Sequence, residues 1–354
     1  MSRIDTFLEL LVKQEGSDLH LVSGQPPRIR INGVLHQIRF RELTEGDLAR
    51  ILEEFIDDKT RSELEEKLSV GFAYEMPELG RFRVNLCRHQ EGLCAVFRAI
   101  SSDLMPLDEM GLPGAVKAAI SQPKGLTLVT GPTGSGKSTT LAALLDHINS
   151  RRMGHIITIE DPIEFIHQFK KCVVTHREIG LHSPSFSEAL KNAMREDPDV
   201  IMVGELRDLE TVALALTAAE TGIQVLGTLH TNCASRTIDR IINIFPARRQ
   251  EQVRSMLAES LRMIVSQQLA RNTEGTGRVL AAEVMINTHA AASIIRSGNS
   301  HKLKSVIQAG GKLGMQSLDG VLKELVRKEI ITGEEAYECA VDRAQFERYA
   351  ARAA

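Results

Sequence analysis

The chain has 354 residues, which favours two domains, and its 43% apolar content is enough to build real cores. A net charge of −3 gives no overall basic surface, which disfavours generic nucleic-acid binding and binding to anionic membranes. No apolar run approaches the ~18 residues of a membrane span, and the first residues lead directly into an amphipathic helix, so we expect no direct membrane insertion and no secretory signal. Five cysteines without a CxxC pair favour reduced thiols in the cytoplasm over a disulfide framework or a zinc ribbon.

The first hundred residues are predicted to form a small mixed domain. Apolar residues at helical spacing predict a helix over 4–14, and short strands are expected over 17–21 and 28–31. Asn32-Gly33 follows the second of these strands and is a strong signal for a two-residue hairpin. Thr44, with an aspartate three residues later, begins another helix with a motif close to a capping box.

A second hairpin is expected over Gly80–Ile100, where polar and apolar residues alternate on both sides of a short turn. The alternation places Arg81 and Arg83 on one face of the first strand, and Arg98 falls on the partner strand. Taken alone, such a group of arginines is most often the solvated cationic face of an edge sheet. Residues Ser101–Gly114 contain serine, proline and glycine and are interpreted as a linker to a second domain.

The second domain is organised around Gly125–Ile148. A buried strand is predicted over Gly125–Thr130, a GxxxxGKS motif follows at once, and apolar residues at helical spacing start a helix inside the motif. Strand, glycine loop and helix in this order are the context of a phosphate-binding loop. The alternative is a glycine-rich turn that caps a core helix. That alternative would leave Lys137 at the mouth of an apolar core without a partner, which is costly.

The chemistry of the motif predicts a nucleotide site. The loop N–H groups and the positive end of the helix would hold a polyphosphate, and Lys137 would neutralise its β- and γ-phosphate oxygens. The hydroxyl of Ser138 would hold Mg²⁺. The predicted cofactors are therefore ATP and Mg²⁺, and the predicted binding residues are Gly131, Pro132, Thr133, Gly134, Ser135, Gly136, Lys137, Ser138 and Thr139.

Acidic residues follow two further predicted strands. A buried strand ends in Glu160-Asp161-Pro162-Ile163-Glu164, and an aliphatic strand ends in Gly204-Glu205, which is the shape of a Walker B segment. The carboxyl ends of parallel strands meet at one edge of a sheet, so we expect these acids to share an edge with Lys137. The Walker B acid is a glutamate beyond the strand, and it is expected to act through a water shell. A solvated acidic loop is the alternative for the first group.

A fourth strand, over 224–229, ends in His230 at the same edge. A lone histidine is usually a satisfied core or surface residue, and a hydrogen bond that senses the phosphate is an equally supported role here. Beyond it we expect a long amphipathic helix over Ala247–Gln267 and a strand over Arg278–Ile286. A mostly helical tail follows from Thr288, and its expected work is contact with a neighbour or a partner.

With these residues in order, the chain resembles the PilT-type motor ATPases of type IV pili, within the secretion-ATPase superfamily. The resemblance runs over essentially the whole chain, and four of its motifs follow one another at matching spacing. The matching segments are Ser17-Asp18-Leu19-His20, the Walker A loop Gly131–Thr140, the Asp box Glu160–Glu164, the Walker B segment Asp197–Asp208, the His box Gly227–Asn232 and Gly314-Met315-Gln316.

The resemblance implies an α/β protein with a PAS-like α+β domain over 1–104, a linker over 105–115, a RecA-like P-loop NTPase core over 116–286 and a helical C-terminal subdomain over 287–354. It implies a homohexamer that hydrolyses Mg-ATP to drive pilus retraction and disassembly, and so twitching motility. The implied location is the cytoplasm, peripheral to the inner membrane through the pilus machine. An inner-membrane platform protein is the implied partner, a paralogous motor ATPase is a further candidate partner, and no nucleic acid is expected.

The same resemblance implies roles within the site. Glu164 becomes the candidate general base, and Glu205 supports the metal and the water. Three arginines of the first domain match the family's sensor or finger arginines, which reverses their interpretation as a solvated face. A cation that reaches the γ-phosphate from another domain or chain is worth on the order of 10³–10⁵ in turnover. The candidate catalytic residues are Lys137, Glu164, Glu205, His230, Arg81, Arg83 and Arg98, and the candidate metal residues are Ser138, Glu160 and Glu205.

Two segments depart from the family pattern. The family's His box usually opens Thr-Gly-His, whereas this chain has Thr221-Gly222-Ile223. The helical motif linked to retraction reads Ala-Ile-Arg-Asn-Leu-Ile-Arg-Glu in PilT proteins, and the corresponding stretch here is Ala292–Ser297, without the acid. We expect nucleotide chemistry to survive both changes, while the partner and the mechanical output stay open.

Two other functions compete with the motor. A weakly hydrolysing regulatory or accessory subunit of the pilus or of the type II secretion machinery is the main alternative. The retained Lys137, Glu164 and Glu205 favour the enzyme, whereas Ile223 and Ser297 favour the regulator. A RecA-like nucleic-acid translocase is disfavoured by a pI near 6.4 and by 4% aromatic residues, because such proteins need stacking platforms.

Overall fold

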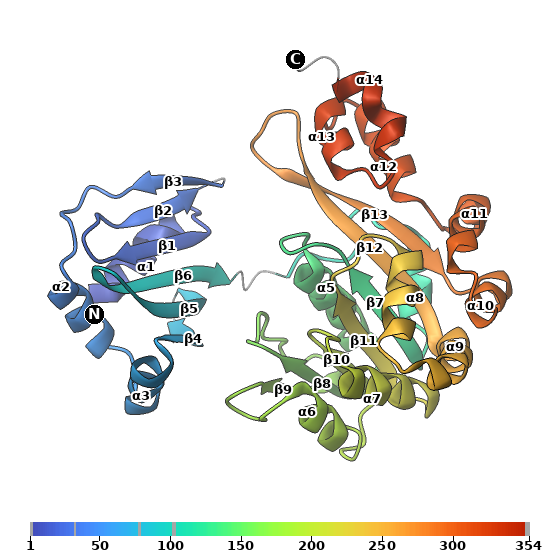
Figure 1. Cartoon of the computed structure of the whole chain (residues 1–354), viewed down its shortest axis with the longest axis horizontal. Coiled ribbons are helices and arrows are strands. Elements are labelled where there is room, and N and C mark those ends of the chain that lie inside the picture. The colour runs from blue at the N-terminus through green and yellow to red at the C-terminus, as the bar shows by residue number, and fades with distance from the viewer. Residues whose placement is uncertain (1–2, 32, 77–78, 101–103, 351–354) are drawn as a thin grey trace. The chain divides into compact units, whose positions relative to one another are not determined.

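The computed structural model describes residues 3–31, 33–76, 79–100 and 104–350. It divides into two compact units, Met1–Asp103 and Leu104–Ala354, each with its own sheet and its own apolar core (Figure 1). Two sheets with flanking helices confirm the predicted α/β class. Within the described ranges, no helix is both long enough and apolar enough to cross a bilayer. The finer division of the second unit into a core and a helical subdomain stays a prediction.

The N-terminal unit is an antiparallel sheet in the order β3-β2-β1-β6-β5-β4, with helices packed against it (Figure 1). The predicted capping box at Thr44 forms with Asp47 and starts the second helix. The predicted hairpin over 80–100 is confirmed as an antiparallel pair. The elements are α1 (Arg3–Lys13), β1 (Asp18–Val22), β2 (Arg28–Ile31), β3 (Val34–Gln37), α2 (Glu45–Glu53), α3 (Asp58–Lys67), β4 (Ser69–Met76), β5 (Gly80–His89) and β6 (Gly92–Ile100).

The C-terminal unit is built on a sheet in the order β13-β12-β7-β11-β10-β8-β9, in which the first strand is antiparallel to its neighbour and the others are parallel (Figure 1). Both faces of this sheet are buried under helices. Its elements are α4 (Gly114–Ile120), β7 (Gly125–Thr130), α5 (Lys137–Asn149), β8 (Gly154–Glu160), β9 (Cys172–Glu178), α6 (Phe186–Ala193), β10 (Val200–Val203), α7 (Leu209–Glu220), β11 (Gln224–Leu229), α8 (Ala234–Asn243), α9 (Ala247–Ser260), β12 (Leu261–Arg271) and β13 (Arg278–Ile286).

Short helices complete this unit after β13. Two of them, α12 and α13, pack with residues of β12 and β13 in a small separate core. The elements are α10 (His289–Arg296), the 3₁₀ turn η1 (Ser300–Lys302), α11 (Leu303–Ala309), η2 (Gly310–Leu313), α12 (Leu318–Arg327), α13 (Gly333–Cys339), η3 (Arg343–Phe346) and α14 (Glu347–Ala350).

The predicted helix over Ala247–Gln267 is wrong in its second half. The helix ends at Ser260, the backbone becomes extended at Leu261, and Leu261–Arg271 forms β12. This strand lies between β7 and β13 and has both faces buried, so its apolar residues do not alternate with polar ones. They instead continue the apolar spacing of α9, which made the two elements look like one helix.

Candidate functional site

The loop between β7 and α5 has the backbone of a phosphate cradle. Gly131, Gly134 and Gly136 have φ angles of 152°, 79° and 84°, a region that favours glycine. A Cβ on Gly131 would lie 2.3 Å from the carbonyl oxygen of Gln267, so a larger residue does not fit. The helix begins at Lys137 after Gly136 and has no side-chain cap. Its first N–H groups therefore point at the loop as donors for an anion.

Lys137 is half-buried in this loop, where its Nζ donates to the carbonyl oxygens of Gly131 at 3.1 Å and Pro132 at 3.0 Å. Burial lowers the pKa of Lys137, and the carboxylates of Glu205 and Glu164 oppose that shift. The structure thus brings the predicted lysine and two of the predicted acids into one electrostatic neighbourhood, at the carboxyl edge of the parallel strands.

The predicted Asp box is a turn whose backbone N–H groups are held by two carboxylates. Glu160 is the buried last residue of β8, and its Oε2 accepts a hydrogen bond from the backbone N–H of Glu164 at 3.2 Å. The N–H of Ile163 donates to the Glu178 carboxylate at 3.0 Å. Glu164 is half-buried and Asp161 is exposed. The turn therefore holds a buried acid and a more accessible one at the same strand end.

Glu205 lies just beyond β10 and contacts two basic side chains. Its Oε2 is 2.7 Å from Nη2 of Arg207, and its Oε1 is 3.3 Å from Nε2 of His230. Burial alone would raise the pKa of Glu205, but Arg207 and His230 outweigh it and the pKa is lowered. Glu205 is therefore ionised at neutral pH. Sequence reasoning assigned no role to Arg207, although it stands two residues after the Walker B acid.

Ser138 and Glu160 line one small cavity of about 30 Å³ beside the first turn of α5. A hydroxyl and a carboxylate are the oxygen ligands that Mg²⁺ prefers, with phosphate and water completing its shell. The described residues contain no cluster of three or more His, Cys, Asp and Glu side chains that would hold a metal by itself. Buried His167 also lines the cavity. Burial and neighbouring His176 lower the pKa of His167 to about 4, so it adds no positive charge against a cation at neutral pH.

Two strands, β12 and β13, support the site from the side, and no sequence signal indicates this support. The hydroxyl of Thr130 at the end of β7 donates to the Ser266 hydroxyl on β12 at 2.8 Å. Ser266 pairs in register with Glu283 on β13. The Glu283 carboxylate accepts from the N–H of Ala234 at 2.7 Å, and so caps α8, whose own N-cap residue makes no side-chain capping hydrogen bond. Glu283 therefore fixes the helix that follows the His230 segment.

Glu283 predicts a measurable pH effect on stability. Burial raises its pKa, the Ala234 bond and Lys304 oppose the shift, and Asp319 adds to it. Above the ordinary value of 4.5, the unfolded chain has released a proton that the folded chain still holds, so stability falls as pH rises. Glu283→Gln keeps an acceptor for the helix and removes this loss. We expect its gain in unfolding midpoint over wild type to be larger at pH 7.5 than at pH 4.5, by calorimetry.

The matched control for this prediction is Glu251→Gln, which changes an exposed glutamate on α9. Its effect on the midpoint is expected to be small and equal at the two pH values. If the gain from Glu283→Gln were also independent of pH, the raised pKa would be contradicted.

The three predicted arginines lie on one face of the N-terminal sheet. Arg83 on β5 stands directly opposite Arg98 on β6, and Arg81 is two residues from Arg83 on the same strand. Arg98 Nε donates to the buried carboxylate of Asp18 at 2.9 Å. Arg81 and Arg83 therefore share a face and Arg98 lies on the partner strand, both as predicted, and the action of the three at a phosphate stays a prediction.

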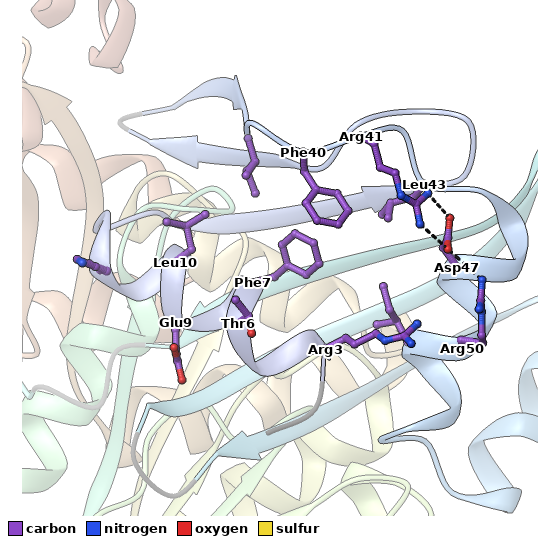
Figure 2. Close-up of a pocket in the computed structure, with 13 residues that line it drawn as sticks. Arg3, Thr6, Phe7, Glu9, Leu10, Phe40, Arg41, Leu43, Asp47 and Arg50 are labelled. Carbon is purple, nitrogen blue, oxygen red and sulfur yellow. Dashed lines mark hydrogen bonds and ion pairs between the residues drawn. The ribbon is translucent and has the colours of Figure 1, made fainter.

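The N-terminal unit also contains a cavity of about 730 Å³, far larger than the one beside α5, between α1 and residues 38–43 (Figure 2). Phe7 and Phe40 meet edge to face in it, with ring centroids 5.3 Å apart. Arg41 forms a bidentate pair with Asp47 there. None of the predicted site residues lines this cavity, and the loop geometry, rather than cavity size, identifies the nucleotide site.

The two departures from the family pattern lie away from the loop. Ile223 precedes β11, at the end of that strand opposite His230, and packs against the apolar core. Residues 292–297 lie on α10 and at its end, where Arg296 is 3.9 Å from Glu259 of α9. Neither change therefore alters a side chain at the phosphate edge of this unit.

Comparison with known proteins places these features in a family. A family profile described as "Type II/IV secretion system protein" matches residues 1–331. The "Type IV pilus retractation ATPase PilT" of Pseudomonas aeruginosa is 50% identical over 337 residues, which cover 95% of this chain and 98% of that protein. The "Type IV pilus ATPase PilU" of the same organism is 40% identical over 332 residues, covering 94% of this chain and 87% of that protein.

A solved structure agrees with these relatives. The crystal structure of the pilus retraction motor PilT with bound ADP matches with a TM-score of 0.90 and 42% identity, over 98% of this chain and 99% of that one. This likeness confirms the predicted fold, an N-terminal domain followed by a RecA-like ATPase domain.

Proposed function

The chain belongs to the type II/IV secretion system protein family, and we propose that it is an ATPase that powers the retraction of type IV pili. The observation that carries the proposal is the 50% identity to a retraction ATPase over nearly the full length of both chains. The phosphate loop supports the same proposal, because Gly131–Thr139 runs from the end of a strand through a glycine loop into the first turn of a helix. In this function, ATP hydrolysis drives the mechanical work of retraction.

The loop and the two strand ends divide the chemistry between them. The N–H groups of the loop and Lys137 hold the β- and γ-phosphates of ATP. Ser138 and Glu160 would hold Mg²⁺, which would supply positive charge to neutralise the phosphate oxygens. Glu164, accessible and near Lys137, takes the proton of the attacking water as general base.

Glu205 keeps the rest of the site in register. It is ionised and binds both Arg207 and His230, so it links the Walker B segment to the His box. From this position it would orient the attacking water, and His230 would sense the γ-phosphate through a hydrogen bond. Loss of the γ-phosphate would thus remove a hydrogen bond from the segment that leads into α8.

Assembly supplies the remaining charges. We propose a homohexamer in which Arg81, Arg83 and Arg98 act as sensor or finger arginines at the γ-phosphate. The assembly is cytoplasmic and meets the inner membrane through a platform protein of the pilus. A paralogous motor, of the kind represented by PilU in Pseudomonas aeruginosa, is a second candidate partner.

Two measurements test this function. The purified chain should hydrolyse ATP in a Mg²⁺-dependent manner, and Glu205→Ala should abolish that turnover. Expression of the chain should restore retraction in a strain that lacks its retraction ATPase. Turnover no higher than that of the Glu205→Ala variant would favour the regulatory alternative, and active hydrolysis without restored retraction would point to a different mechanical output.

A further inference from the structure

Gln267 on β12 lies directly beneath the phosphate loop. Its side chain is buried, with 1% exposed, and its Nε2 donates to the carbonyl oxygen of Ser135 at 2.7 Å. The same residue closes the loop at both ends. A Cβ on Gly131 would lie 2.3 Å from its carbonyl oxygen, and a Cβ on Gly136 would lie 3.3 Å from its Nε2. Gln267 therefore touches the start, the middle and the end of the cradle.

The hydrogen bond fixes the plane of one loop peptide. In a planar trans peptide the C=O and N–H groups point in opposite directions. Because the Ser135 carbonyl is held toward Gln267, the N–H of Gly136 points away from β12. Backbone N–H groups presented by such a loop are the groups that bind phosphate oxygens. The Gln267 amide thus sets the direction of a phosphate donor without itself facing the ligand.

We propose that Gln267 is a positioning residue for nucleotide phosphate: it holds the Ser135 carbonyl so that the Gly136 N–H is already aimed at the phosphate chain of ATP or ADP. The proposal rests on the proposed nucleotide function. A side chain without a donor at this position would leave the Ser135 carbonyl buried and unsatisfied, which is costly. The Ser135–Gly136 peptide would then rotate so that its carbonyl finds another donor, and the Gly136 N–H would no longer point at the phosphate. The effect should appear in nucleotide binding rather than in the chemical step.

The next residue on the strand provides a matched control. Gln268 points to the opposite face of β12, is half-buried, and its Nε2 donates to the backbone carbonyl of Cys339 at 3.3 Å. Both residues are thus glutamines on the same strand, and each donates a hydrogen bond to a backbone carbonyl. They differ in that one carbonyl belongs to the phosphate loop and the other to the helical tail.

The experiment measures ADP binding by calorimetry and steady-state ATPase kinetics on the full-length protein carrying Gln267→Met or Gln268→Met. We expect Gln267→Met to raise the Kd of ADP and the KM of ATP about tenfold, with kcat within about threefold of wild type. Gln268→Met should leave the ADP Kd within about twofold, although each variant loses a side-chain hydrogen bond and lowers the unfolding midpoint.

A second variant guards against misfolding. Gln267→Asn keeps the amide but is one methylene too short to reach Ser135, and it should weaken ADP binding in the same direction. An unchanged ADP Kd in the Gln267 variants, or an equal loss in the Gln268→Met variant, would overturn the inference. Failure of the unaltered chain to bind ADP would overturn the proposed function instead.

Discussion

Replacing Lys137 with alanine is expected to lower kcat/KM for ATP at least about 100-fold, a loss of about 2.7 kcal/mol in transition-state stabilisation. Lys137 is the half-buried cation of the loop, and burial lowers its pKa while Glu205 and Glu164 oppose the shift. Without this lysine, the loop would have no positive side chain to offset the repulsion between the triphosphate and those two carboxylates. Calorimetric titration with ATP and a phosphate-release assay measure the loss.

Lys124→Ala is the matched control for this result. Lys124 is an exposed lysine that precedes β7, at the end of the strand opposite the loop. It should retain wild-type turnover, and it should still restore pilus retraction where Lys137→Ala does not. Comparable activity in the two variants would refute the assignment of the loop as the nucleotide site.

Arg83→Ala is expected to reduce ATP turnover about 10³-fold while changing the Kd of ATP by no more than about threefold. Among the described residues Arg83 has no ion-pair partner, and its side chain is exposed on the face shared with Arg98. A finger arginine acts on the charge that develops during phosphoryl transfer, so its loss should spare ground-state binding. Turnover and ATP binding are measured on the assembled protein.

Arg98→Ala is a less clean test than Arg83→Ala. Arg98 pairs with the buried Asp18, whose pKa burial would raise but Ser17 and Arg98 together hold below its usual range. Its removal would therefore disturb the N-terminal unit as well as any phosphate contact. Arg88→Ala is the control for Arg83→Ala. Arg88 lies on the opposite face of the same strand, and its ion pair with Glu45 is exposed, so its loss should cost little stability. If Arg83→Ala and Arg88→Ala had the same turnover, Arg83 would be interpreted as part of a solvated cationic face and not as a finger arginine.

The phosphate cradle was predictable because its signals are local. The strand over Gly125–Thr130, the glycines at positive φ and the helix start at Lys137 all lie within a short stretch of chain. The acids and the histidine needed one further rule, that parallel strands end at a common edge, and the order of β7, β11, β10 and β8 satisfies it.

Contacts from distant parts of the chain were not predictable in this way. Glu283 and Gln267 lie in strands whose two faces are buried, and nothing near them in the sequence marks the helix end or the loop that they hold. The first part of β12, Leu261–Gln267, was predicted as helix, so the pairing of β12 with β7 was not predicted. Arg207 was visible in the sequence, but its pairing with Glu205 depends on the geometry of a loop.

The strand that supports the cradle also constrains when the cradle can form. Thr130 and Ser266 are 136 residues apart, and Gln267 binds a carbonyl 132 residues before it. A chain still on the ribosome that has emerged only to Ser260 contains the complete glycine motif but lacks the strand beneath it. ATP that binds before β12 has joined the sheet therefore meets an incomplete cradle, and its stabilisation of the unfinished domain is expected to increase once β12 is in place, late in synthesis.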